Sequence, residues 1–341
     1  MTSLITKTNY TQFRNIKLVY FKIYVKIING DIKMNEGNLY EKALEHKGKD
    51  FLQIATAFNH TIRIYVTKTT DIVLEAQKVH ELYPTAVAAL GRSMTATLIM
   101  GSMLKGKQSI AVKIEGDGPL GKIVCESDAS GRVMGYLNNG GVYLKYNNGK
   151  LNVGDAVGRT GSLTVVKDLH LKEPFVSSVP LISGEIGEDF AYYFAESEQV
   201  PTSVSVGVLV GLNGECLAAG GFIIQVMPGC EESTICKLEE SLKNVPPVSQ
   251  LIQEGKTGRE ILKVILGDEP FEILKTMPVK FACSCSKERF TAGIKSLGYD
   301  TVKKIYDEDH GLAATCQYCH HEYVYTESEL EEMLKEMKAV N

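Results

Sequence analysis

The sequence of 341 residues contains no tryptophan and no apolar run long enough to cross a membrane. Its most apolar early stretch, residues 16–28, is too short for a span and is interrupted by Lys22 and Lys26. No small-residue cleavage site of the kind that ends a secretion signal follows this stretch. We therefore expect a cytosolic protein with no membrane partner, whose cysteines are reduced thiols.

The chain also lacks an excess of basic residues. Its net charge of −4 and pI near 6.0 argue against nucleic acid as the main partner. Residues 1–33 carry six Lys and Arg against one Asp, a net of +5, which leaves −9 for residues 34–341. We expect residues 1–33 to be a poorly ordered or non-native extension, with Met34 as the native start. The alternative is an amphipathic segment that lies on a membrane surface, and N-terminal sequencing distinguishes the two.

Motifs for nucleotide binding and for nucleophilic catalysis are missing. Residues 116–121 match G-x-G-x-x-G, but Pro119 intervenes and a strand pattern follows, which predicts a hairpin turn. Residues 101–108 resemble a P-loop, but the motif ends in Gln108 and runs from helix to strand. No Ser/His/Asp set and no G-x-S-x-G elbow is present. We therefore expect neither a nucleotide cofactor nor catalytic residues, and the chain is not predicted to be an enzyme.

What is present is a mixed pattern of helices and strands. Residues 37–57 have apolar positions at helical spacing, and Pro84 opens a long apolar helix that reaches about Leu104 and should be central and buried. Most of the stretch from 108 to 185 alternates as short strands, including an edge strand over 179–185. This order predicts an α+β domain with an antiparallel-rich sheet.

After Met227-Pro228-Gly229 the pattern becomes helical and polar. One apolar stripe begins at Ile235, and a capping box at Thr257 opens another helix. Such narrow apolar faces need something to dock on. The sequence predicts an extension over 1–33, an α+β core domain over 34–229, a helical linker over 230–276 and a small C-terminal zinc-binding domain over 277–341.

That last segment carries the most informative motif of the chain. Cys283 and Cys285 form C-x-C, and Cys316 and Cys319 form C-x-x-C thirty residues further on. Four thiols paired in this way in a cytosolic protein indicate a closed four-sulfur zinc site. A segment of this size with few large apolar residues gains much of its folding energy from such a metal.

The quartet has two interpretations. In the first it is a permanent structural zinc site. In the second it is a redox switch, since zinc holds sulfur as the oxidisable thiolate, and a sulfenic acid formed there can condense with a neighbouring thiol. The other four cysteines are expected to be small buried hydrophobes, and the histidines that follow Cys319 are expected to be solvated or to support the ligands: Cys125, Cys216, Cys230, Cys236, His320 and His321.

Two other classes of protein remain open at this point. A zinc ribbon that binds nucleic acid would carry a basic stripe with aromatic residues, which residues 280–341 lack. A thiol oxidoreductase would place its C-x-x-C at a helix start, whereas Cys316 and Cys319 precede a β-type run over 323–325. Salt-sensitive binding of RNA or DNA would support the first class, and insulin reduction would support the second.

Several motifs together resemble the 33-kilodalton heat-shock chaperonin family, the redox-regulated holdases. The resemblance runs from about residue 38 to about 338 and leaves residues 1–33 outside. It is carried by these stretches: ALGR at 89–92, GDGPLG at 116–121, LTVVKD at 163–168, EQVP at 198–201, AGGF at 219–222, QVMPG at 225–229, CSCSKER at 283–289 and CQYC at 316–319.

The resemblance implies a function. It implies a reduced, inactive form that holds one zinc ion per chain through Cys283, Cys285, Cys316 and Cys319. Oxidation is then expected to form the disulfides Cys283–Cys285 and Cys316–Cys319, release the zinc and unfold the linker. The active form is expected to be a dimeric holdase that binds unfolding proteins without ATP.

Overall fold

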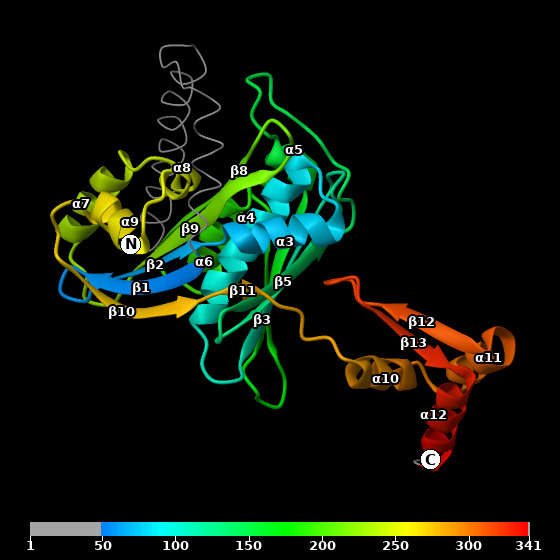
Figure 1. Cartoon of the computed structure of the whole chain (residues 1–341). Coiled ribbons are helices and arrows are strands. Elements are labelled where there is room, and N and C mark those ends of the chain that lie inside the picture. Colours follow the sequence, from blue (N-terminus) through cyan, green and yellow to red (C-terminus); the bar gives the residue numbers. More distant parts are fainter. Residues whose placement is uncertain (1–48, 340–341) are drawn as a thin grey trace. The chain divides into compact units, whose positions relative to one another are not determined.

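The computed structural model describes residues 49–339, which form two compact units with their boundary between Phe281 and Ala282 (Figure 1). We call them the N-terminal unit and the C-terminal unit. The predicted extension over 1–33, and the part of the predicted helix over 37–48, lie outside the described residues. Within residues 49–339 no helix is both long enough and apolar enough to cross a membrane.

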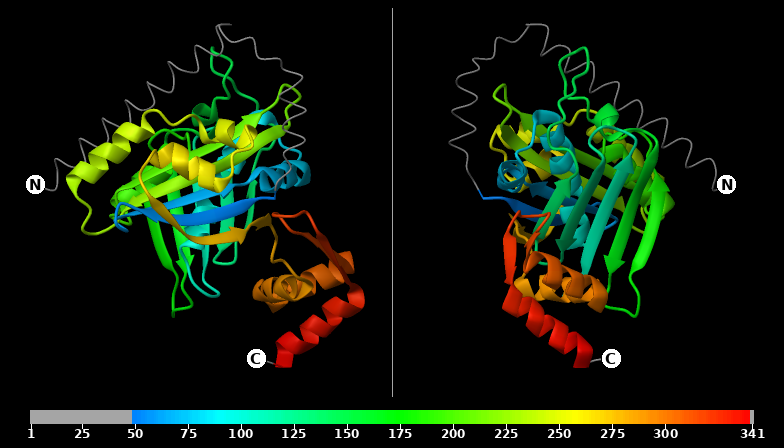
Figure 2. Two further views of the ribbon diagram at one scale, coloured as in Figure 1. Left: turned by 60° about the vertical axis from the view of Figure 1, so that its left-hand side comes forward. Right: turned by 90° about the vertical axis from the view of Figure 1, so that its right-hand side faces the viewer.

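Two antiparallel-rich sheets form the frame of the N-terminal unit. The first has five strands in the order β10-β1-β2-β9-β8. The second has six in the order β11-β5-β4-β3-β6-β7, and only its β11–β5 pair is parallel (Figure 2). The strand bounds are β1 Phe51–Ala57, β2 Ile62–Lys68, β3 Ser109–Gly116, β4 Lys122–Asp128, β5 Arg132–Leu137, β6 Gly161–Asp168, β7 Phe175–Pro180, β8 Thr202–Val210, β9 Cys216–Val226, β10 Phe271–Pro278 and β11 Lys280–Phe281.

The central helix α4, Pro84–Ser102, contacts strands of both sheets. Pro84 occupies its first turn, as predicted, and every residue except Pro84 and Arg92 is buried. The buried hydroxyls of Ser93, Thr95 and Thr97 donate to carbonyls four residues earlier. Because these hydroxyls are hydrogen-bonded, their burial costs little free energy of folding. Three shorter helices complete this part of the unit: α3 Thr70–His80, α5 Val153–Val157 and α6 Gly187–Glu196.

Three helices then cover one face of the five-stranded sheet: α7 Glu232–Leu242, α8 Val248–Gln253 and α9 Gly258–Leu266. Their apolar residues pack with those of the sheet in a core of their own, which includes Leu238, Leu251 and Leu262 from the helices and Ile64 and Phe222 from the strands. Of these, α7 and α9 are the amphipathic helices predicted for the linker, whereas α8 was not predicted. The surface on which they dock is this sheet face.

Two predicted helical stretches are strands instead. Phe51–Ala57 is β1, because it pairs with β2 on one side and with β10 on the other. Leu52 packs in one core and Ala57 in the other, so both faces of β1 are buried, and the apolar spacing does not reveal a strand. Residues 271–276, predicted as part of the helical linker, belong to β10 for the same reason.

The predicted edge strand over 179–185 is shifted along the chain. The strand is β7, Phe175–Pro180, and it does lie at the edge of its sheet. It ends at Pro180, as expected for a residue without an amide hydrogen. The chain then turns through Gly184, whose φ is +70°, into α6.

The C-terminal unit consists of α10 Lys287–Ser296, α11 Tyr299–Asp309, the hairpin β12 Gly311–Thr315 and β13 Glu322–Thr326, and α12 Glu327–Ala339. A capping box opens α12: Thr326 N–H donates to Glu329 Oε2 at 2.9 Å, and Glu329 N–H donates to Thr326 Oγ1 at 3.4 Å. The core of the unit is small and has six buried side chains: Ile294, Val302, Tyr325, Leu330, Met333 and Leu334.

Candidate metal and redox centre

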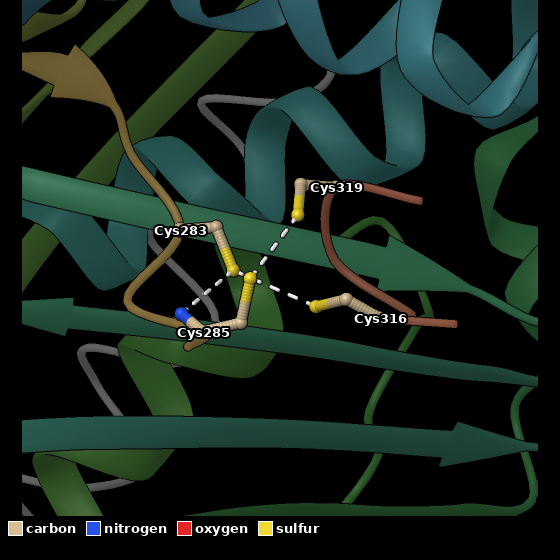
Figure 3. Close-up of side chains that lie close together, drawn as sticks. All are labelled: Cys283, Cys285, Cys316 and Cys319. Carbon is tan, nitrogen blue, oxygen red and sulfur yellow. Dashed lines mark hydrogen bonds between the residues drawn. The ribbon is translucent and has the colours of Figure 1, made fainter. Parts of the chain in front are cut away.

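The four cysteines of the two motifs lie together in the C-terminal unit. Cys283 and Cys285 precede α10, while Cys316 and Cys319 form the turn between β12 and β13 (Figure 3). All four sulfur atoms are within 4.8 Å of one another. The tertiary structure therefore joins two motifs that are far apart in sequence, as the spacing predicted.

The sulfur separations fit a metal centre in its thiol form. Cys283 Sγ lies 3.6 Å from Cys316 Sγ, and Cys285 Sγ lies 3.5 Å from Cys319 Sγ. A tetrahedron with metal–sulfur bonds of ~2.3 Å has sulfur–sulfur edges of roughly 3.8 Å, whereas a disulfide requires about 2.05 Å. All four cysteines are free thiols, so the quartet has the spacing of a ligand set.

Local hydrogen bonds hold each motif in its turn. On the first, Ser286 caps α10 by accepting from Arg289 N at 3.3 Å, and the Arg289 guanidinium donates to the Ser284 carbonyl at 3.0 Å. On the second, Cys316 N–H donates to the His321 carbonyl at 2.9 Å, and His320 N–H donates to the Cys316 carbonyl at 2.9 Å. His320 has φ +55°, in the left-handed region that closes such a turn.

The four thiols are electrostatically unequal. Burial, followed by the hydrogen-bonded neighbouring thiols, raises the pKa of Cys283. Burial also raises the pKa of Cys319. At Cys285 burial acts in the same direction but is outweighed, because the Tyr323 hydroxyl and the other three thiols hydrogen-bond to its sulfur and lower its pKa. The pKa of Cys285 is therefore shifted in the direction opposite to those of Cys283 and Cys319.

Tyr323 is a residue of the site that the sequence analysis missed. Its hydroxyl donates to Cys285 Sγ at 3.2 Å, and its ring lies against Phe290 and His321, with ring centroids 4.8 and 4.6 Å away. The sequence did contain a pattern that indicates an inward-facing Tyr323. Side chains alternate along β13, so Tyr323 and Tyr325 share a face while Val324 is exposed. That alternation does not by itself reveal a sulfur partner.

The neighbouring histidines lie beside the sulfur cluster. Among the described residues, the group that could hold a metal ion contains the four cysteines and neither His320 nor His321. His321 is exposed and packs its ring edge-on against Tyr323, so it supports the residue that touches Cys285.

Comparisons with known proteins show the family of this chain and agree with its fold. A family model described as Hsp33 protein matches residues 50–326. The chain belongs to the Hsp33 family. The 33 kDa chaperonin of Bacillus licheniformis is 50% identical over 289 residues, which are 84% of this chain and 100% of that protein. The 33 kDa chaperonin of Bacillus subtilis is 51% identical over 283 residues, which are 83% and 97% of the two chains.

A solved structure extends the likeness to three dimensions. The crystal structure of the 33 kDa chaperonin from Thermotoga maritima superposes on this Hsp33 family member with a TM-score of 0.78 at 35% identity. The match covers 86% of this chain and 100% of that one. The predicted α+β fold with an antiparallel-rich sheet is confirmed.

The remaining cysteines of this Hsp33 family member correct one prediction. Cys125 and Cys216 are buried, as expected, and burial raises the pKa of both thiols far above the usual range. Cys236 is exposed on α7, and Cys230 is only partly buried just before that helix. The sequence analysis did not anticipate this, because Cys236 lies outside the apolar stripe that faces the sheet.

Proposed function

We propose that this chain is a redox-regulated holdase chaperone that binds unfolding proteins and prevents their aggregation without ATP. Membership of the Hsp33 family and the relatives' name, 33 kDa chaperonin, support a chaperone. The observation that carries the redox part is the quartet of free thiols within 4.8 Å of one another. In the inactive form the quartet holds one metal ion.

The donor set fits zinc. Four cysteine sulfurs at tetrahedral spacing are the ligands of closed structural zinc sites, in which zinc holds all four as thiolates. Cys283 and Cys285 would bind from the α10 side, and Cys316 and Cys319 from the hairpin. The Tyr323 hydroxyl would orient Cys285 by donating to its sulfur at 3.2 Å.

Oxidation by peroxide removes these ligands in a balanced way. One thiolate attacks peroxide and becomes a sulfenic acid, a neighbouring thiol displaces the hydroxyl as water, and a disulfide forms. Two disulfides consume two peroxide molecules and yield four waters. The proposed pairs are Cys283–Cys285 and Cys316–Cys319. In the thiol form the shortest sulfur–sulfur distances instead join Cys283 to Cys316 and Cys285 to Cys319. The proposed pairing is therefore based on closeness in sequence and not on these distances.

Loss of the metal should unfold the C-terminal unit. Its six buried side chains form a small core, and the other links between α10 and the hairpin are side-chain contacts such as those of Tyr323 with Cys285 and Phe290. A disulfide between near neighbours closes a very short loop and constrains the unfolded chain little. The unit would therefore lose the cross-link that holds α10 to the hairpin.

The proposed client-binding surface lies beneath the helices α7–α9. They cover an apolar sheet face that includes Ile62, Ile64, Val66 and Phe222. We propose that oxidation leads these short helices to undock, which exposes this face and their own apolar sides to unfolding clients, and that the active form is a homodimer. Nucleic acid is an unsuitable partner for the C-terminal unit, since residues 282–341 carry seven Lys and Arg against eleven Asp and Glu.

The proposal is tested with peroxide and mild heat. The oxidised full-length protein should release one zinc per chain and suppress aggregation of a heat-unfolding client, while the reduced protein should do neither. Cys236→Ser serves as the matched control, because this exposed thiol lies outside the quartet and its loss should change neither readout. If the wild-type protein neither releases zinc nor suppresses aggregation, the proposal is wrong.

The disulfide pairing has a test of its own. The oxidised protein is digested, and its linked peptides are identified by mass spectrometry. Links of Cys283 to Cys285 and of Cys316 to Cys319 are expected. Links between the two motifs, such as Cys283 to Cys316, would contradict the pairing and leave the chaperone activity to be judged by aggregation alone.

A further inference from the structure

Strand β7 is an exposed, uncharged edge of the six-stranded sheet. It pairs with β6 on one side, and no other strand of the described residues pairs with its outer side. Phe175 and Val176 are 58% and 64% exposed, and Leu171 just before the strand is 61% exposed. Figure 2 (right) shows the sheet's strands side by side, ending at this edge.

The other sheet edges of the N-terminal unit are protected. β10 carries the exposed charges Glu272 and Lys275, and β11 has only two residues and begins with Lys280. β8 is contacted by the helices α4, α6 and α8. Charges, short length and helical cover are the usual ways to keep an edge strand from pairing with other chains. From Phe175 to Pro180 β7 contains no charge at all.

On the outer side of β7, some backbone groups have no partner strand among residues 49–339. Leu181 N–H donates to the Gly161 carbonyl at 3.0 Å, and Ser162 lies opposite Pro180. Hydrogen bonding alternates along an antiparallel pair, so Phe175, Ser177 and Val179 bond to β6. The amide and carbonyl groups of Val176 and Ser178 therefore point away from β6, toward the open edge.

β7 is also held firmly from its inner side. The hydroxyls of Ser177 and the fully buried Tyr193 lie 3.0 Å apart. Tyr193 donates to Glu198 at 2.6 Å, and Lys167 of β6 forms an ion pair with the same carboxylate. Because this network joins α6 to β6 and β7, the open edge is a rigid template.

We propose that the β7 edge binds extended, uncharged, apolar segments of unfolding proteins by adding them as a further strand. This inference rests on the proposed chaperone function and identifies a client-binding surface in addition to the face beneath α7–α9. Main-chain bonds to Val176 and Ser178 recognise any extended chain, and the apolar side chains favour uncharged ones. Such recognition is independent of sequence, as a holdase requires.

The edge is open in the reduced protein as well. Reduced protein should therefore bind an unfolded chain weakly through β7, and oxidised protein should bind it more tightly through β7 and the uncovered face together. The probe is reduced, carboxymethylated α-lactalbumin, which stays unfolded without heating. Its dissociation constant is measured for full-length protein in both redox states.

Two variants block the edge in different ways. Val176→Lys places a charge on it, and Ser178→Pro removes an outward amide that β6 does not use. Each should weaken client binding by about tenfold or more, the effect of losing roughly 1.4 kcal/mol. Leu212→Lys is the matched control, because Leu212 is 98% exposed in the β8–β9 turn and its replacement should leave binding unchanged. Zinc release on oxidation should be the same in all four proteins.

Hydrogen exchange gives a direct reading of the strand. Bound client should slow exchange of the Val176 and Ser178 amides. Unchanged client binding in both edge variants would overturn the inference. The inference would also be overturned if the edge variants lost the dimer in sedimentation while their client binding stayed intact. That result would make β7 an interface between two copies of the chain. If oxidised wild-type protein releases no zinc and binds no client, the proposed function itself fails.

Discussion

Tyr323 of β13 donates its hydroxyl to the sulfur of Cys285, in the loop before α10, at 3.2 Å. The bond stabilises the thiolate form of Cys285, the form that binds a metal. It also links the strand β13 to the loop before α10. The Tyr323 hydroxyl thus affects both the ionisation of Cys285 and the packing of β13 against the loop before α10.

Tyr323→Phe should lower the affinity for zinc by about tenfold, the lower end of the effect of losing such a supporting bond. Affinity is measured by competition with a chromogenic chelator. Tyr325→Phe is the control, because the Tyr325 hydroxyl donates to the Lys287 carbonyl at 2.9 Å and touches no sulfur. Equal zinc affinities in wild-type and Tyr323→Phe proteins would show that the bond does not support the metal.

Removal of the metal from the reduced protein should unfold the C-terminal unit and leave most of the N-terminal unit intact. The reason is the contrast between a core of six buried side chains and the much larger cores around α4 and beneath α7–α9. Hydrogen exchange with and without chelator measures this by segment. Protection that persists over 287–339 without metal would mean that the small core suffices.

Leu262→Ala should make the reduced protein partly active. Leu262 is fully buried between α9 and the sheet, and its truncation should cost ~2–5 kcal/mol of packing. The helices would then undock more readily without oxidation. Aggregation of a heat-unfolding client is the readout, and Lys263→Ala, an exposed change on the same helix, should have no effect. If the helices of the reduced Leu262→Ala protein undock but the protein does not suppress aggregation, undocking alone does not cause activity.

Asp50 should make the stability of the N-terminal unit depend on pH. Burial raises the pKa of this carboxyl from 3.8 to about 7, although it accepts a bond from Ile72 N at 2.9 Å. The folded protein therefore holds this proton when the unfolded chain has lost it. Stability falls as pH rises from about 4 to about 7, by as much as ~4 kcal/mol, and the loss is complete above that range.

Asp50→Asn removes this titration while keeping an oxygen for the Ile72 amide. Urea unfolding at pH 5 and pH 8, with zinc present, should show the variant gaining stability over wild type as pH rises. Glu75→Gln, at an exposed position of α3 that does not act on Asp50, should show no such trend. A constant difference between Asp50→Asn and wild type at both pH values would mean that Asp50 does not titrate in this range.

Features with local causes were predictable. The helix from Pro84 and the capping box at Thr257 depend on residues close in sequence, and the structure contains both. The two rejected nucleotide motifs also lie between the kinds of elements that the local sequence predicted. One is the β3–β4 hairpin, and the other follows the end of α4.

Features with distant causes were missed. β1 and β10 are strands because each pairs with the other across some two hundred residues, and no local propensity reports that pairing. The exposure of Cys236 depends on which side of α7 meets the sheet. The bond from Tyr323 to Cys285 joins residues 38 positions apart.

By itself, the sequence determined which four thiols are available to a metal at the candidate site. A C-x-C and a C-x-x-C supply four soft donors, because the chemistry of sulfur is a property of the residues. Only the tertiary structure decided that the four sulfurs lie within 4.8 Å, that its neighbours lower the pKa of Cys285, and that no other strand of residues 49–339 pairs with the outer side of β7. Those outcomes depend on non-local packing, which closes a loop of thirty residues and assigns every strand its neighbours.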